Sequence, residues 1–249
     1  MDKKTIILFG TGVLTNSWKP IINAINSVEI ENIISTLDEA NSYLTRVVYL
    51  LRYYTANNES SEITELNNLI FRIKKEIIFQ LNLFVSKDKF IVQDEFENII
   101  DTYNLNDENS FFITTNWDNY IETKFKIHSN NILYLHGNIT NNFIYLPSEV
   151  SFDLFRKDEE KIHFMLAHNQ LMEKLKHAET FILYGISLDP LDAELLQTLN
   201  GGLSQSNKLK HIVIVDPNFD IIKNRLNLII ELNILNKIVF TDFLKNYYK

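Results

Sequence analysis

The sequence contains no cysteine among its 249 residues. Disulfides and zinc sites built from thiolates are therefore excluded, and a reducing compartment, the cytoplasm, is the expected location. Glycine occurs only 6 times, far below the ~7% of an average protein. We therefore expect each glycine to stand where the backbone turns with positive φ or approaches another segment closely.

Long apolar runs and clustered basic residues are also lacking. No apolar run approaches the ~20 residues that a membrane helix needs, and the segment 1–10 is too short and too strand-like for a signal peptide. The formal net charge of -8 argues against a surface for duplex nucleic acid, which requires clustered Lys and Arg. The length fits one large domain over residues 1–249.

The rest of the chain is organised around the segment 111–118, Phe-Phe-Ile-Thr-Thr-Asn-Trp-Asp. An apolar run ends in a polar tip that carries Asn116 and Asp118, and a helix is predicted over 119–126. A second apolar run, 132–135, is followed by His136. Ligand crevices of open α/β sheets lie at the carboxyl ends of strands, so these three polar side chains are expected at one rim.

The amino-terminal segment predicts a strand, a glycine turn and a helix. The run 5–9 is apolar, Gly10-Thr11-Gly12 follows it, and a helix opens near Trp18 with Ser17 as its expected N-cap. This layout is typical of a nucleotide phosphate cradle. The full dinucleotide fingerprint is missing, because position 15 is Thr and no strand with an acidic ribose ligand follows about twenty residues later.

Residues 28–105 are predicted to be helical. Apolar residues recur at spacings of three and four over 31–54 and 63–85, with a polar loop at 56–61 between them and a third helix near 92–103. We interpret this region as a helical insertion within the domain. An ordinary layer of helices covering the sheet explains the same pattern equally well.

The remaining chain alternates between strand and helix patterns. The predicted elements are an extended piece at 142–147, a helix at 158–177, a strand at 180–184, a helix at 191–203 that stops at Gly201-Gly202, a strand at 210–215, a helix at 221–232, a strand at 237–240 and a short terminal helix. Such alternation predicts an α/β fold with a Rossmann-like, doubly wound, mostly parallel sheet and an inserted helical layer.

Five predicted strand ends carry polar residues or glycine: Gly10-Thr11-Gly12, Asn116-Trp117-Asp118, His136-Gly137, Gly185-Ile186-Ser187 and Asp216. This pattern resembles the sirtuin-like NAD-binding domain family, and within it the bacterial sirtuin-like NAD-hydrolysing effectors of antiphage defence. The most specific similarity is Thr-Thr-Asn-aromatic-Asp followed by Leu-His-Gly. Two features depart from the family: the first loop is shorter than the usual Gly-Ala-Gly-x-Ser, and the four-cysteine zinc module of the deacylating sirtuins is absent.

The resemblance implies a sirtuin-like fold and an NAD+ glycohydrolase that releases nicotinamide and ADP-ribose. NAD+ would be the substrate, with no metal and no other cofactor. Nicotinamide is a cationic leaving group, so cleavage through an oxocarbenium-like sugar needs positioning and a base more than a strong acid. The implied catalytic residues are Asn116 and His136, and the implied NAD-binding residues are Gly10, Thr11, Gly12, Thr115, Asp118, Gly185, Ser187 and Asp216.

Simpler structural roles remain open for several of these residues. Asp118 can cap the following helix, His136 can be structural, Ser187 and Asp189 can form a turn before Pro190, and Asp216 can begin a helix with Pro217. Trp18 is more typical of a core residue than of a stacking partner.

At the level of function, two alternatives to a hydrolase stay open. One is a non-catalytic module that binds NAD or ADP-ribose for a sensor complex, and the shortened first loop favours this alternative. The other, weaker alternative is a protein deacylase. The family also implies a role in abortive infection, where NAD cleavage must be controlled. We therefore expect a hetero-oligomer with a separately encoded sensor or nucleotide-handling protein, docked on the helices of residues 28–105.

Overall fold

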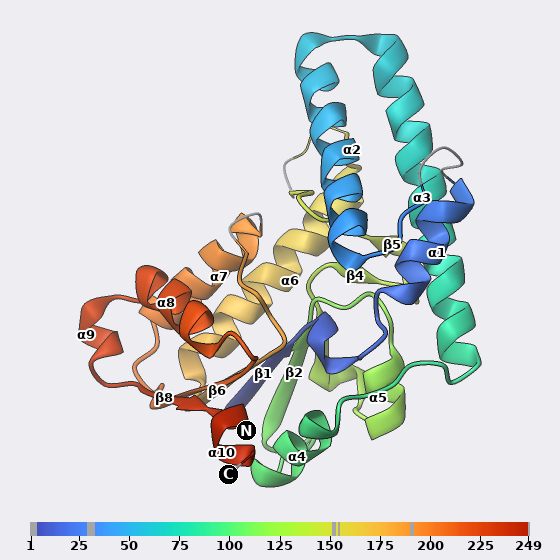
Figure 1. Cartoon of the computed structure of the whole chain (residues 1–249). Coiled ribbons are helices and arrows are strands. Elements are labelled where there is room, and N and C mark those ends of the chain that lie inside the picture. Colours follow the sequence, from blue (N-terminus) through green and yellow to red (C-terminus); the bar gives the residue numbers. More distant parts are fainter. Residues whose placement is uncertain (1–3, 29–32, 151–152, 154, 190–191, 249) are drawn as a thin grey trace.

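The computed structural model describes residues 4–28, 33–150, 153, 155–189 and 192–248. Its centre is a six-stranded sheet in the order β3-β2-β1-β6-β7-β8, and every pair of neighbouring strands in it is parallel (Figure 1). Counted along the chain, this is the 3-2-1-4-5-6 order of a Rossmann-like fold. The predicted Rossmann-like α/β architecture is confirmed. The strands of this sheet are β1 (Thr5–Phe9), β2 (Ser110–Thr114), β3 (Ile132–Tyr134), β6 (Thr180–Tyr184), β7 (His211–Val215) and β8 (Val239–Asp242).

The central strands are apolar because both of their faces are buried. In β1, Ile7 and Phe9 belong to one hydrophobic cluster, whereas Ile6 and Leu8 belong to the other. Successive side chains of a strand point to opposite faces, so a strand covered on both sides reads as a continuous apolar run. This explains why the apolar runs in the sequence predict the boundaries of these strands to within one or two residues.

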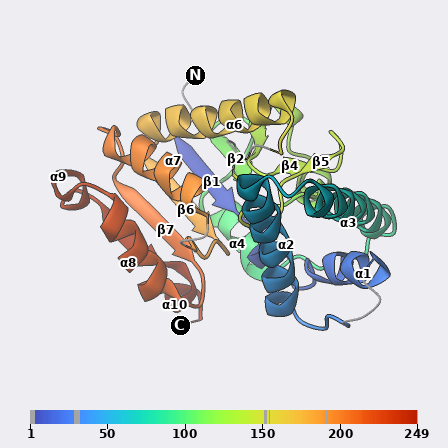
Figure 2. The ribbon, with the colours of Figure 1, turned by 90° about the horizontal axis from the view of Figure 1, so that it is seen from above.

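Helices cover both faces of the sheet. The first cluster joins the sheet to α1–α4, and the second joins it to α6–α8 (Figure 2). A two-stranded antiparallel hairpin of β4 and β5 stands apart from the main sheet. The remaining described elements are η1 (Thr11–Val13), α1 (Lys19–Val28), α2 (Leu37–Asn57), α3 (Ser60–Ser86), α4 (Asp94–Thr102), α5 (Tyr120–Phe125), η2 (Ser129–Asn131), β4 (Gly137–Asn138), β5 (Phe143–Ile144), α6 (Asp158–His177), α7 (Ala193–Ser204), α8 (Phe219–Ile229), α9 (Leu232–Leu235) and α10 (Phe243–Tyr247).

The long helices α2 and α3 form a hairpin that projects from the body of the molecule (Figure 1). The predicted pair of helices is confirmed, although α2 begins at Leu37 and position 31 lies outside the described residues. A capping box fixes that start, because Thr36 accepts from the Glu39 N–H and the Glu39 carboxylate accepts from the Thr36 N–H. Asn58 in the left-handed conformation then ends α2, so the turn between the helices is shorter than the predicted loop.

Ion pairs with buried carboxylates tie the α2–α3 hairpin to the segment between β5 and α6. Arg52 of α2 pairs with Asp153 at 2.5 Å, and Lys74 of α3 pairs with Glu149 at 2.9 Å. Glu149 also pairs with Arg156 at 3.1 Å, and both of these side chains are almost fully buried. Removing one member would leave a buried charge uncompensated, so the network holds the hairpin in a defined position.

Three sequence-based boundaries are wrong. α7 does not stop at Gly201-Gly202 but continues through them to Ser204. Gly202 is needed for the close contact with α6 and not as a C-cap, because a Cβ at this position would lie 2.8 Å from Leu175 Cβ. Position 191, the predicted start of this helix, lies outside the described residues. The predicted helix 221–232 is two helices, α8 and α9. Ser17 does not adjoin α1, which begins at Lys19, and its hydroxyl donates to the Thr11 carbonyl.

Within the described ranges, no helix combines the length and the apolar character required to cross a membrane.

Candidate functional site

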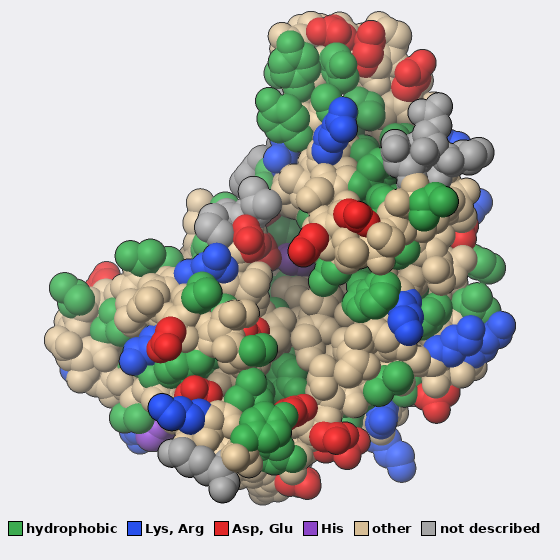
Figure 3. All heavy atoms as spheres, in the orientation of Figure 1, with side chains coloured by type: hydrophobic (Ala, Val, Ile, Leu, Met, Phe, Trp, Pro, Cys, Tyr) green, Lys and Arg blue, Asp and Glu red, His purple; other side chains and the backbone are tan. Residues whose placement is uncertain are grey.

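A cleft of about 850 Å³ opens at the carboxyl ends of the strands, where the strand order changes direction between β1 and β6. Figure 3 shows this face hollowed between the projecting hairpin and the α7–α8 side. Ligand sites of open α/β sheets lie at such a switch point. Six of the predicted site residues line the cleft, from the ends of four strands: Thr11, Gly12, Thr115, Gly185, Ser187 and Asp216.

The floor of the cleft is a contact between two backbones. A Cβ on Gly12 would lie 2.6 Å from Gly185 Cα, and Gly185 has a φ of 56°. Both positions therefore require glycine, one for close approach and one for a left-handed turn. Gly10 lies beneath them. Its N–H donates to the Tyr184 carbonyl at 3.0 Å, and a Cβ there would meet Ile186 and the Gly185 carbonyl. Gly10 is thus a packing residue, and its N–H is already paired.

Asn116 and His136 follow the carboxyl ends of the neighbouring strands β2 and β3 by the same number of residues. Thr114 pairs with Tyr134 in the parallel register of β2 and β3, and each of the two residues follows two positions later. Asn116 is 5% exposed, and neither Oδ1 nor Nδ2 of its amide has a hydrogen-bond partner among the described residues. Neither Asn116 nor His136 lines the cleft. Both adjoin its lining: Asn116 follows Thr115 in the chain, and the His136 imidazole, whose side chain is 21% exposed, lies 3.6 Å from Asp192.

Asp118 is buried behind the polar tip of β2. Its Oδ1 accepts from the Tyr120 N–H at 3.0 Å, at the first residue of α5. Burial raises the pKa of this carboxyl to about 6, and the hydrogen bond from Tyr120 opposes the rise. In the structure, Asp118 thus has the local role of accepting a backbone hydrogen bond at the start of α5.

Carboxylates dominate the charge of the cleft. Five of its lining residues are acidic, and the described part of the lining contains no Lys, Arg or His. Arg225 contacts a lining residue: its Nη1 donates to the Ser187 carbonyl at 2.5 Å. Acidic side chains are also visible around the hollow in Figure 3. The five carboxylates are those of Asp38, Glu95, Asp189, Asp192 and Asp216.

Sequence reasoning missed most of this acidic lining. Asp38 and Glu95 come from the first turns of α2 and α4, two helices that carry no strand-end signal. Asp192 precedes α7 and accepts from the Leu195 N–H at 3.4 Å. Aspartate directly before an apolar helix is a recognisable N-cap signal, so Asp192 could have been placed at the rim from sequence. No group of three His, Asp or Glu side chains in the described chain is arranged to hold a metal ion.

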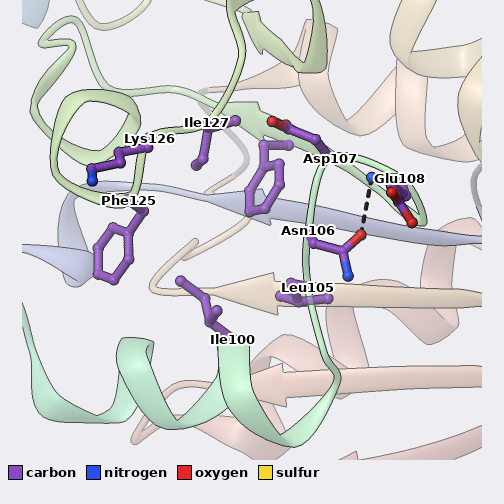
Figure 4. A pocket seen from close by; sticks show the side chains of 9 residues that line it. Ile100, Leu105, Asn106, Asp107, Glu108, Phe125, Lys126 and Ile127 are labelled. Carbon is purple, nitrogen blue, oxygen red and sulfur yellow. Dashed lines mark hydrogen bonds between the residues drawn. The ribbon is translucent and has the colours of Figure 1, made fainter.

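A second cavity, of about 540 Å³, lies at the opposite end of β2 (Figure 4). Its walls are largely apolar, and Asn106 accepts there from the Glu108 N–H at 2.9 Å. The Asp107 carboxylate in the same rim accepts from the His128 N–H and from the Asn131 amide. These side chains of Asn106 and Asp107 already accept hydrogen bonds within the protein, and the cavity lies away from the carboxyl ends of the strands. The cleft is therefore the candidate site.

Comparison with known proteins adds no identification: no protein-family model, no curated protein and no solved structure matches this chain.

Proposed function

We propose that the protein is an NAD+ glycohydrolase of the sirtuin-like kind, which cleaves NAD+ to nicotinamide and ADP-ribose. One observation carries the proposal: the unpaired, buried Asn116 amide follows β2 two residues after its last paired residue, as His136 follows the neighbouring β3. A buried polar group without a partner costs about 1–3 kcal/mol. Such a cost is typical of functional sites, where a bound ligand supplies the missing hydrogen bonds.

The cleft offers groups that match the parts of NAD+. The first backbone hydrogen bond of η1 runs from the Val13 N–H to the Gly10 carbonyl. The turn itself therefore does not use the N–H groups of Thr11 and Gly12, which can donate to a pyrophosphate. Ribose hydroxyls can donate to a carboxylate such as Asp216, which lines the cleft. The acidic lining also favours the positively charged nicotinamide ring of the oxidised cofactor.

The chemistry needs two actions near the reactive sugar. Asn116 would hold a ribose hydroxyl or the attacking water, and His136 would accept a proton from that oxygen as the bond to nicotinamide breaks. The leaving nicotinamide departs neutral, because its ring nitrogen takes the electron pair of the glycosidic bond. The water oxygen forms the new bond to the sugar carbon, which gives ADP-ribose.

The test is nicotinamide release from NAD+ by the purified chain, alone and with candidate partners. Asn116→Ala and His136→Ala should each lower the rate ~10²-fold or more. Asn141→Ala and His177→Ala are matched controls at exposed positions and should cleave at the parental rate. NADP+, with one more phosphate facing the acidic lining, should be the poorer substrate. Parental rates in both site variants would refute the assignment.

A second candidate is a non-catalytic module that binds NAD or ADP-ribose. The observation that favours it is that neither Asn116 nor His136 lines the cleft. A module of this kind would bind NAD+ in the cleft and release no nicotinamide under any condition. Calorimetric binding measured beside the cleavage assay separates the two functions. A protein deacylase would instead release nicotinamide only in the presence of an acylated peptide.

We further propose that this activity serves antiphage defence as the effector of an abortive infection system. A hydrolase that depletes NAD+ must be switched, so its regulation would come from a separately encoded sensor or nucleotide-handling partner within a hetero-oligomer. The projecting α2–α3 hairpin supports this idea, since it exposes four aromatic side chains: Tyr49, Tyr53, Phe71 and Phe79.

A further inference from the structure

The imidazole of His136 faces a carboxylate that the sequence did not single out. His136 Nε2 lies 3.6 Å from Oδ2 of Asp192. The other oxygen of this carboxylate, Oδ1, accepts from the Leu195 N–H in the first turn of α7. Asp192 therefore presents one oxygen to the helix and the other to the ring, and the helix fixes the direction of the carboxylate.

The plane of the His136 ring is set by an aromatic neighbour. Phe164 of α6 lies parallel to it within 2°, with 6.4 Å between ring centroids. Phe164 is itself 3% exposed and stacks on His168 at 4.2 Å. Phe164, held inside the core, thus favours this plane for the imidazole, and within it Nε2 is the ring nitrogen beside the Asp192 carboxylate.

We propose that Asp192 is a positioning residue that holds His136 in the Nε2–H tautomer. In a neutral imidazole one nitrogen donates and the other accepts, so a carboxylate beside Nε2 leaves the lone pair on Nδ1. This step rests on the proposed function for the base role of His136. There, Nδ1 takes the proton of the water or ribose hydroxyl, and the imidazolium that forms is stabilised by the Asp192 carboxylate.

His168 provides an internal reference with the opposite tautomer. Its Nδ1 lies 2.7 Å from Thr198 Oγ1, and the Thr198 hydroxyl proton is already donated to the Glu194 carbonyl at 2.8 Å. Because a hydroxyl has a single proton, Nδ1 of His168 must be the donor. Burial, and after it the nearby His136, lowers the pKa of His168 to about 3, so this ring stays neutral at ordinary pH.

The test is long-range ¹H–¹⁵N correlation NMR of ¹⁵N-labelled protein at pH ~8, above the titration range of histidine. We expect the Nε2–H pattern for His136 and the Nδ1–H pattern for His168. In Asp192→Asn, Oδ1 continues to cap α7, so the amide nitrogen faces the ring and His136 should change to Nδ1–H. His168 should not change.

Cleavage kinetics supply the second readout. In Asp192→Asn the kcat should fall ~10²–10⁴-fold, as expected for the wrong histidine tautomer, with little change in KM. Asp242→Asn is the matched control, because Asp242 caps α10 in the same way with 3.0 Å to the Lys245 N–H, and it should leave both readouts unchanged.

Two results would overturn the proposal: an Nδ1–H pattern for His136 in the parent, or a tautomer that Asp192→Asn does not change. The NMR result stands without catalysis. A parent that shows the expected tautomer but releases no nicotinamide, either alone or with its partners, would therefore refute the hydrolase and leave the positioning role intact.

Discussion

At the scale of single residues, the tip of β2 concentrates polar groups that are buried. Asn116 and Asp118 are 5% and 7% exposed, and both follow directly on an apolar strand. The cost of burying them differs. The Asn116 amide has no described partner, whereas Asp118 accepts one hydrogen bond and shifts its pKa instead. Such residues weaken a fold unless a ligand or a local turn uses them.

Because the pKa of Asp118 is raised from 3.8 to about 6, the free energy of unfolding is expected to depend on pH. Between these two values the folded protein holds a proton that the unfolded chain has released, so its stability falls as pH rises through this window. The loss is at most roughly 3 kcal/mol, at 1.36 kcal/mol per unit. Asp118→Asn keeps the acceptor for Tyr120 and removes the titration.

Urea unfolding of the parent and of Asp118→Asn at a series of pH values checks this. The stability of the variant relative to the parent should increase from about pH 4 to about pH 7. A difference that stays constant over that range would mean that the Asp118 carboxyl titrates as it does in the unfolded chain.

At the scale of elements, two adjacent glycines of α7 have different surroundings where this helix packs against α6. A Cβ on Gly202 would lie 2.8 Å from Leu175 Cβ and 3.0 Å from the Met172 carbonyl, atoms that cannot move independently of α6. A Cβ on Gly201 would meet the sulfur of Met172 at 2.8 Å, and this sulfur belongs to a flexible side chain.

Alanine at these two positions should therefore have opposite effects. Gly202→Ala should destabilise the protein by about 1–3 kcal/mol through overpacking, which outweighs the gain in helix propensity. Gly201→Ala should be neutral or stabilising by up to about 1 kcal/mol, because that gain dominates once Met172 adjusts. Denaturant midpoints of both variants measure the difference. A Gly202→Ala protein as stable as Gly201→Ala would contradict the close helix contact.

At the scale of the whole molecule, the α2–α3 hairpin projects beyond the helical layer that covers the sheet (Figure 1). Its inner positions join the core, but Tyr49 and Tyr53, one helical turn apart on α2, are 63% and 50% exposed. Exposed aromatic side chains at such spacing are typical of a surface that receives another protein. Ion pairs of Arg52 and Lys74 with buried carboxylates anchor the hairpin to the body of the molecule.

We expect the isolated chain to cleave NAD+ poorly and to gain activity on assembly. Replacing Tyr49 and Tyr53 together by Ser should weaken assembly without lowering the melting temperature, since both rings are largely solvated. Leu228→Ser, at a still more exposed position on α8, is the control. Light scattering and nicotinamide release, measured with and without the partner, test this. Full turnover by a strictly monomeric preparation would disprove control by assembly.

The sequence by itself determined the order of most elements along the chain and the parallel, doubly wound character of the sheet. The runs 5–9 and 180–184 coincide with β1 and β6, and the predicted helix 158–177 coincides with α6. The physical reason is local: burial on both faces imposes apolar runs on strands, and burial on one face imposes a spacing of three and four on helices. The glycines and polar tips likewise marked six of the residues that line the cleft.

Only the tertiary structure decided which of these residues meet. It paired the Gly10 N–H with the Tyr184 carbonyl, left Asn116 and His136 next to the lining of the cleft, and brought Asp192 to His136. It also showed that Gly202 allows two helices to approach and does not end one. Such contacts join residues far apart in the chain, and their distances depend on how whole layers pack, which no local pattern of residues encodes.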